Sequence, residues 1–89
     1  MAWQIELTAT ALKQLAKLDK AEARRITGFL RQRLATAEDP RELGKSLTGP
    51  KFGVYWRYRV GDYRIICDIQ DQRLRIVVVE LGHRRDVYR

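Results

Sequence analysis

The sequence predicts a small two-layer α+β domain with the element order β-α-α-β-β-β, in which an N-terminal helical hairpin packs on a mainly antiparallel sheet. Three observations predict this fold: a short alternating segment at the start, two segments of helical periodicity joined by a tight turn, and three alternating segments at the end. At 89 residues, the chain suits one modest hydrophobic core. We therefore expect residues 1–89 to form a single domain, with any activity on its own surface.

The first strand and the first helix are predicted from residues 3–18. Residues 3–7 alternate apolar and polar side chains, which is typical of a half-buried strand. Thr8 then offers a hydroxyl that can cap a helix. Leu12, Leu15 and Leu18 follow at three-residue steps, so we expect them to form the buried stripe of that helix.

A second helix is predicted after a very short turn. Asp19 precedes Glu22 by three residues, which is the spacing of a capping box. Gly28 interrupts this helix at a cost of about 1 kcal/mol relative to alanine, and it either permits a close helix approach or is incidental. Pro40 ends the helical pattern, and a loop is predicted from there to Gly53. The buried stripe is expected to contain Ala23, Ile26, Leu30, Leu34 and Ala37.

Three strands are predicted over residues 54–60, 63–70 and 73–81, and the two joints between them are short enough for antiparallel hairpins. The inward-facing side chains are expected to be Val54, Trp56, Tyr58, Ile65, Cys67, Ile69, Leu74, Ile76 and Val78.

The opposite face of the first of these strands carries Tyr55, Arg57 and Arg59, because strand side chains alternate between faces. One face can therefore be buried while the other binds a ligand. Arg59 also has a structural interpretation, in which it forms an ion pair with Asp62 or with a neighbouring carboxylate.

The charge of the chain favours a polyanionic partner. The formal net charge is +7 and the isoelectric point is near 10.1. Eight of the nine basic residues from position 51 onward are arginines, whose planar guanidinium binds phosphate in a bidentate manner. Much of the basic excess in the N-terminal half is explained by solvated helix faces.

Other kinds of site are disfavoured by the sequence. Cys67 is the only cysteine and lies in an apolar run, so we interpret it as a core residue in preference to a nucleophile. The single histidine and the scattered carboxylates lack the spacing of a zinc or two-metal site, and no metal or other cofactor is expected. Neither a secretory signal nor a run of about eighteen apolar residues is found. We expect a cytoplasmic protein without a membrane partner.

Four segments of the chain resemble the RelE/ParE superfamily of bacterial toxins, and within it the RelE branch. These segments are ALKQLAKL at residues 11–18, LTG at residues 47–49, YRVGDYR at residues 58–64 and GHRRDVY at residues 82–88. The last two together are fairly specific. The resemblance covers nearly the whole chain, and its element order agrees with the one predicted above.

The resemblance implies a type II toxin–antitoxin toxin that inhibits translation as an endoribonuclease. Such a toxin cuts messenger RNA in the A site of the 70S ribosome without a metal, and the 2′-hydroxyl of the RNA is the nucleophile. The implied partners are the ribosome, messenger RNA and a cognate RelB-like antitoxin. Promoter DNA is expected to be bound only through the antitoxin complex.

The resemblance also implies roles for individual residues. Arg57 and Arg64 match positions that stabilise charge at the scissile phosphate, Arg84 matches the residue that stabilises or protonates the leaving group, and Tyr88 matches a terminal aromatic residue that stacks on a base or orients the substrate. Tyr55 and Arg57 stand where the best-known members carry lysines. Substrate or ribosomal RNA contacts are expected from Lys51, Tyr55, Arg59 and Arg85.

An arginine is a poor general base, so the base is sought elsewhere. His83 is the candidate, because its side chain ordinarily titrates near neutral pH. Two alternatives stay open: His83 packs at a strand end or beside Tyr88, or catalysis depends on positioning and electrostatics without a strong base.

Two other functions compete with the nuclease. A ParE-like relative inhibits DNA gyrase by binding, and shared fold does not exclude this activity. A non-catalytic nucleic-acid-binding module would use the same arginines for salt-sensitive affinity alone. The set of Arg57, Arg64, Arg84 and Tyr88 favours the nuclease, because a gyrase inhibitor has no chemical need for it.

Overall fold

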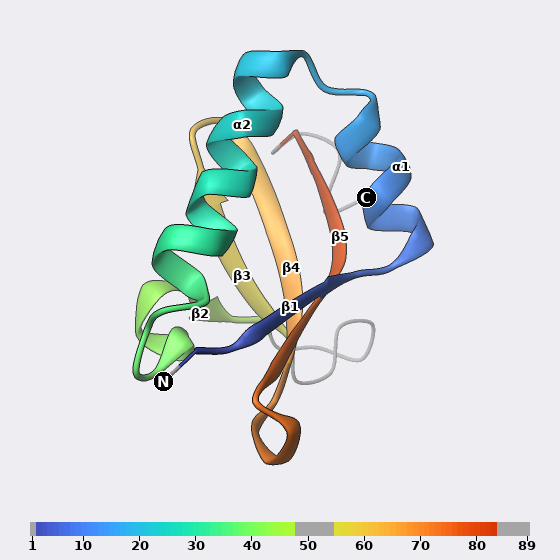
Figure 1. The fold of residues 1–89 in the computed structure, drawn as a ribbon. Helices are drawn as coiled ribbons and strands as arrows, with labels where there is room; N and C mark the ends of the chain where they lie inside the picture. Colours follow the sequence, from blue (N-terminus) through green and yellow to red (C-terminus); the bar gives the residue numbers. More distant parts are fainter. Residues whose placement is uncertain (1, 48–54, 84–89) are drawn as a thin grey trace.

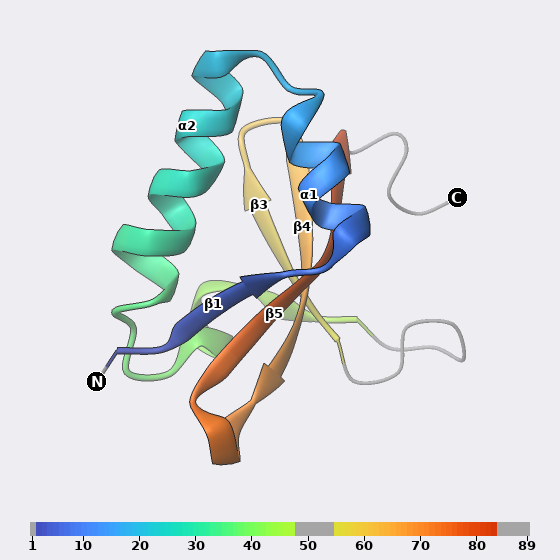
Figure 2. The same ribbon diagram turned by 45° about the vertical axis from the view of Figure 1, so that its right-hand side comes forward.

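The protein forms a five-stranded sheet with two helices packed on one of its faces (Figures 1 and 2). The computed structural model describes residues 2–47 and 55–83. The strands are β1 (Gln4–Leu7), β2 (Lys45–Ser46), β3 (Trp56–Val60), β4 (Tyr63–Gln70) and β5 (Arg75–His83), and the helices are α1 (Ala9–Ala16) and α2 (Lys20–Gly28). The strand order is β1-β5-β4-β3-β2, in which only the β1–β5 pair is parallel. The predicted α+β class and mainly antiparallel sheet are confirmed.

The cap of α1 also ties this helix to the sheet. The Thr8 hydroxyl accepts a hydrogen bond from the Ala11 amide at 3.1 Å, as predicted, and donates one to the Val79 carbonyl of β5 at 2.7 Å. Trp3 is buried before β1, and its indole donates to the Ala37 carbonyl at 3.1 Å. The N-terminal segment therefore joins β5 to the end of the second helix.

The predicted buried stripe of α1 was wrong at Leu12. Leu12 is 55% exposed, whereas Ala11 is fully buried and Leu15 and Leu18 pack against the core. The physical reason is the drift of a three-residue step around a helix of 3.6 residues per turn. Ala11 and Leu15, four residues apart, define the face that meets the sheet, and Leu12 falls outside it.

The second helix is longer than α2 alone, because it continues as a π-helical segment over Phe29–Leu34. The amide of Ala35 donates to the carbonyl of Leu30 at 2.9 Å, which is the wider i to i−5 spacing. Asp19 caps the start by accepting from the Glu22 amide at 2.8 Å, as predicted. The central residues of the predicted stripe are confirmed as buried: Ile26, Leu30 and Leu34.

Residues 40–47 were predicted as loop, and this prediction was wrong. They form a 3₁₀ turn, Pro40–Leu43, followed by β2, which pairs with the start of β3. The buried Tyr58 side chain holds this turn, because its hydroxyl donates a hydrogen bond to the Pro40 carbonyl at 2.8 Å. This short edge strand becomes part of the candidate site described below.

The core lies between the sheet and the helices and contains the inward side chains of β3, β4 and β5. Strand β5 has an irregularity, because Ile66 pairs with Glu80 while Cys67 pairs with Val78, which leaves Val79 as an extra residue. The bulge explains why Val78 and Leu81 are both fully buried although they are three residues apart. Before β5, Leu74 takes a left-handed conformation with φ 49° and closes the 3₁₀ turn Asp71–Arg73.

Candidate functional site

Three arginines lie on the face of the sheet opposite the helices. Arg57 pairs with Ile66, and Arg59 pairs directly with Arg64 across the β3–β4 hairpin. Paired residues in an antiparallel sheet direct their side chains to the same face. The alternate residues of β3, Tyr58 and Val60, are buried in the core, so the predicted division of β3 into two faces is confirmed.

Arg64 is the most unusual of the three, because it is only 6% exposed. Its Nη1 donates to the Tyr63 carbonyl at 3.5 Å, which is a long hydrogen bond. Within residues 2–47 and 55–83 it has no carboxylate partner. Removing an arginine from water without a counter-ion is costly, and an anionic ligand would offset that cost.

The arginines line a hollow of about 360 Å³, which we call the arginine hollow. Its walls are Glu42, Leu43, Gly44, Lys45, Arg57, Arg59 and Arg64. Four of these seven residues are cationic and one is acidic, so the hollow favours an anion. A hollow of this volume has room for a phosphate group of a larger polyanion.

Lys45 is a member of this hollow that the sequence analysis missed. It is exposed, and β2 places it directly opposite Arg57 on the same face of the sheet. Gly44 allows the close approach of this strand, since a Cβ atom there would lie 2.4 Å from the Arg57 carbonyl oxygen and 2.7 Å from the Tyr58 ring. Glycine before a basic residue is the one sequence signal for this arrangement, because a two-residue strand is too short to show alternation.

His83 lies on the other face of the sheet. It pairs with Tyr63, and the two rings meet edge to face with centroids 5.8 Å apart. Arg64 pairs with Gly82, the preceding residue of β5, so its side chain points the opposite way. The structure therefore does not bring His83 together with the arginines, although the two groups are neighbours in sequence.

Of the remaining predicted site residues, the structure describes Tyr55 and Arg59. Tyr55 is half-buried just before β3, where its carbonyl accepts from the Leu47 amide at 2.8 Å. Within residues 2–47 and 55–83, Arg59 forms no ion pair, so the predicted pairing with Asp62 was wrong. Four predicted residues lie outside the described residues: Lys51, Arg84, Arg85 and Tyr88.

Other chemistries have little support among the described residues. Residues 2–47 and 55–83 contain no group of three or more histidine, cysteine or acidic side chains that could hold a metal ion. Cys67 is fully buried, and this burial raises the pKa of its thiol, which suits a core residue and disfavours a nucleophile. No helix in the described ranges is long and apolar enough to cross a membrane.

Comparisons with known proteins point to one family. The family described as "ParE toxin of type II toxin-antitoxin system, parDE" matches residues 5–88. The chain is 29% identical to Toxin RelG of Mycobacterium tuberculosis over 89 residues, which is 100% of this chain and 99% of that protein. It is 30% identical to Toxin RelE of the same organism over 87 residues, or 98% of this chain and 87% of that protein.

A solved structure agrees with these matches. The fold is similar to that in the crystal structure of the toxin–antitoxin complex RelBE2 from Mycobacterium tuberculosis, with a TM-score of 0.85 and 26% sequence identity. The match covers 97% of this chain and 95% of the other.

Proposed function

The chain belongs to the RelE/ParE superfamily as a toxin of a type II toxin–antitoxin system, and from this premise we propose that it inhibits translation by cutting messenger RNA in the ribosomal A site. The observation that carries the proposal is the arginine hollow, in which the buried Arg64 lacks a carboxylate partner in the described ranges. A buried guanidinium without a counter-ion is costly, and a phosphate group of a bound RNA would offset that cost.

In the proposed reaction, the ribose 2′-oxygen attacks the adjacent phosphorus and the bond from phosphorus to the 5′-oxygen breaks. The 2′-hydroxyl loses its proton, the departing 5′-oxygen gains one, and a 2′,3′-cyclic phosphate and a 5′-hydroxyl result. Negative charge accumulates on the phosphoryl oxygens at the pentavalent stage. Arg57 and Arg64 stabilise this charge, and Lys45 adds a third cation beside Arg57.

Catalysis in this proposal depends mainly on positioning and electrostatic stabilisation, because the described part of the hollow contains no side chain that ordinarily titrates near neutral pH. His83, the base considered from the sequence, stands on the opposite face beside Tyr63. Arg84 at the leaving group and Tyr88 stacked on a base complete the proposed set. These two roles rest on the sequence resemblance alone.

The proposed partners follow from the proposed activity. The 70S ribosome presents the messenger RNA, and a RelB-like antitoxin neutralises the toxin in the cell that makes it. An acidic, amphipathic antitoxin segment would complement the net charge of +7. Contact with promoter DNA is expected only through the antitoxin, and the site of action is the cytoplasm.

Inhibition of DNA gyrase is a second candidate function, favoured by the match to the ParE toxin family. Primer extension on a messenger RNA translated in a reconstituted system separates the two. The nuclease proposal predicts cuts within A-site codons that require ribosomes and disappear with Arg84→Ala. Absence of cuts, together with a loss of supercoiling in a purified gyrase assay, would replace the nuclease with a gyrase inhibitor.

A further inference from the structure

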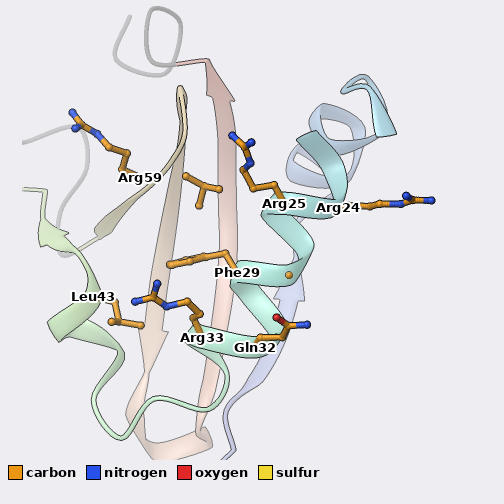
Figure 3. A pocket seen from close by; sticks show the side chains of 9 residues that line it. Arg24, Arg25, Phe29, Gln32, Arg33, Leu43 and Arg59 are labelled. Atoms are coloured by element: carbon orange, nitrogen blue, oxygen red, sulfur yellow. The ribbon is translucent and has the colours of Figure 1, made fainter. Parts of the chain in front are cut away.

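A second hollow, with a volume of about 620 Å³, lies between the second helix and β3 (Figure 3). We call it the helix–strand groove. Figure 3 shows Arg25 and Arg33 reaching from the helix towards the sheet side, with Phe29 between them. Leu43 and Arg59 line the opposite side of the groove.

The arginines of this groove are poorly neutralised by the protein itself. Within residues 2–47 and 55–83, Arg33 and Arg59 form no ion pair. Arg25 has one, with Glu22 at 3.9 Å, and its side chain is 60% exposed, so this pair is weak. Four arginines line the groove, and Figure 3 shows the fourth, Arg24, pointing away from the sheet. Arg25, Arg33 and Arg59 therefore remain as cations with little internal compensation.

Local backbone structure makes room for these cations. Gly61, at the β3–β4 turn, has φ +59°, and a Cβ atom there would lie 2.8 Å from Nη1 of Arg25. The guanidinium of Arg25 thus lies against a turn without a side chain. On the helix side, Phe29 and Arg33 belong to the π-helical segment, a local geometry that is frequent at functional sites.

The helix–strand groove and the arginine hollow meet at Arg59, which lines both. The register explains this position. Strand β2 pairs only with Trp56 and Arg57, so β3 has no β2 partner from Tyr58 to Val60 and Arg59 lies at an edge of the described sheet. A polyanion held over the arginine hollow can therefore continue past this edge into the groove.

The floor of the groove favours a nucleic acid over a polypeptide. Val60 is only 8% exposed, and the ring of Phe29 packs against the ring of Tyr58 with centroids 5.8 Å apart. An amphipathic helix would find little free apolar surface there. Phosphate groups need only guanidinium groups, which Arg25 and Arg33 supply from the helix and Arg59 supplies at the edge of β3.

We propose that the helix–strand groove binds a second stretch of RNA backbone, continuous with the stretch held over the arginine hollow, through Arg25, Arg33 and Arg59. The inference rests on the proposed function for the identity of the polyanion. It adds a binding site on the helical side of the sheet edge, away from the reacting phosphate.

The test measures binding without cleavage, so that it does not depend on nuclease activity. The full chain is titrated into a fluorescein-labelled, 16-nucleotide single-stranded RNA at several salt concentrations, and anisotropy reports the affinity. The test variant is Arg25→Gln with Arg33→Gln. The control is Arg31→Gln with Arg73→Gln, which removes the same charge from exposed arginines that line neither hollow.

We expect the test variant to bind RNA about tenfold more weakly or worse, with a salt slope lower by about 1 for each lost phosphate contact. The control should stay within about threefold of the wild type. Equal losses in both variants would overturn the proposal, because the effect would then be one of net charge. Unchanged RNA binding with weaker binding of labelled poly-glutamate would also overturn it and assign the groove to an acidic polypeptide.

RNA binding and A-site cleavage, measured on the same preparations, distinguish failure of this inference from failure of the proposed function. If the wild-type chain binds RNA through the groove but cuts no A-site codon on ribosomes, the nuclease proposal fails while the groove stands. If it cuts A-site codons and the test variant binds RNA and cuts normally, the groove fails while the nuclease stands.

Discussion

At the residue scale, Arg64 is where burial and charge conflict most strongly. Arg64 is almost excluded from water, and its guanidinium donates only a long hydrogen bond, to the Tyr63 carbonyl. In the proposed function, a guanidinium held in this way would stabilise charge without reorganising when the RNA binds. Arg57 and Lys45 are exposed more than Arg64 and face the same hollow.

Lys45 is predicted to contribute by its charge. Lys45→Met should slow single-turnover cleavage on ribosomes by about 10- to 100-fold, because one cation beside the pentavalent phosphate is lost. Lys45→Arg should keep the rate within about fivefold, since arginine restores the charge at this exposed position. A similar large loss in both variants would show that proton transfer, not charge, is the contribution of this amine.

His83 is predicted to be dispensable for the chemical step. His83→Gln should retain the single-turnover rate within about threefold. The reason is the register, which places its side chain with Tyr63 on the helical side of the sheet. A folded variant that binds the ribosome normally but loses cleavage would restore His83 as the base.

At the scale of elements, β2 shows how a short strand completes the site. Two residues of β2 pair with β3, and they carry Lys45 to the side of Arg57. The strand approaches so closely that Gly44 has no space for a side chain. The packing of this edge therefore positions Lys45 in the arginine hollow.

Gly44→Ala is predicted to destabilise the fold by about 1–3 kcal/mol, because the new methyl group would overlap the Arg57 carbonyl and the Tyr58 ring. Gly28→Ala is the matched control. It lies in a helical conformation with open space around the added Cβ, so it should stabilise by about 0.5–1 kcal/mol. Urea unfolding measures both, and equal effects of the two substitutions would contradict the packing described for β2.

The 3₁₀ turn and the β4–β5 turn are joined by Arg41 and Asp71, whose Nη1 and Oδ1 atoms lie 3.0 Å apart. The hydrogen bond from Arg41 lowers the pKa of the Asp71 carboxyl. A lowered folded-state pKa gives stability that is present above the unfolded value, about 3.9, and lost as pH falls through the folded value.

Asp71→Asn should therefore be less stable than the wild type at pH 6, and the difference should shrink as the pH falls below about 4. Urea unfolding of both proteins at pH 6 and pH 3 measures it. A difference that grows at the lower pH would contradict this ion pair.

Local sequence patterns were sufficient for most elements and failed where tertiary contacts decide. The caps at Thr8 and Asp19 depend on neighbouring residues, so both were predictable. The exposure of Leu12 was not, because three apolar residues at three-residue steps fit more than one helical face. The bulge at Val79 and the strand at Lys45 depend on pairing partners distant in sequence.

At the candidate site, too, local sequence patterns were insufficient where strand pairing decides the position of a side chain. Alternation along β3 was sufficient to place Arg57 and Arg59 on one face, and the pairing of Arg59 with Arg64 adds Arg64 to that face. His83 was grouped with them because it is adjacent to basic residues in the sequence, yet adjacent strand residues point to opposite faces. Only the pairing of Tyr63 with His83 shows which face it takes.

At the scale of the whole molecule, the two faces of the sheet differ in what they carry. The helices and the core occupy one face, and the arginine hollow lies on the other. The arginine hollow and the helix–strand groove meet at the edge of β3, where Arg59 lines both. An 89-residue chain with a net charge of +7 can in this way present a long basic surface beside a single core.

The most direct test of the central claim is the single-turnover rate of A-site cleavage on ribosomes programmed with a defined codon, for the wild type, Arg57→Ala and Arg73→Ala. We predict that Arg57→Ala slows cleavage by about 100-fold or more while ribosome binding is kept, and that Arg73→Ala, which removes an exposed arginine outside the hollow, cuts at nearly the wild-type rate. Cleavage by Arg57→Ala at the wild-type rate, or no cleavage by the folded wild type, would contradict the claim that the arginine hollow is the active site of a ribosome-dependent nuclease.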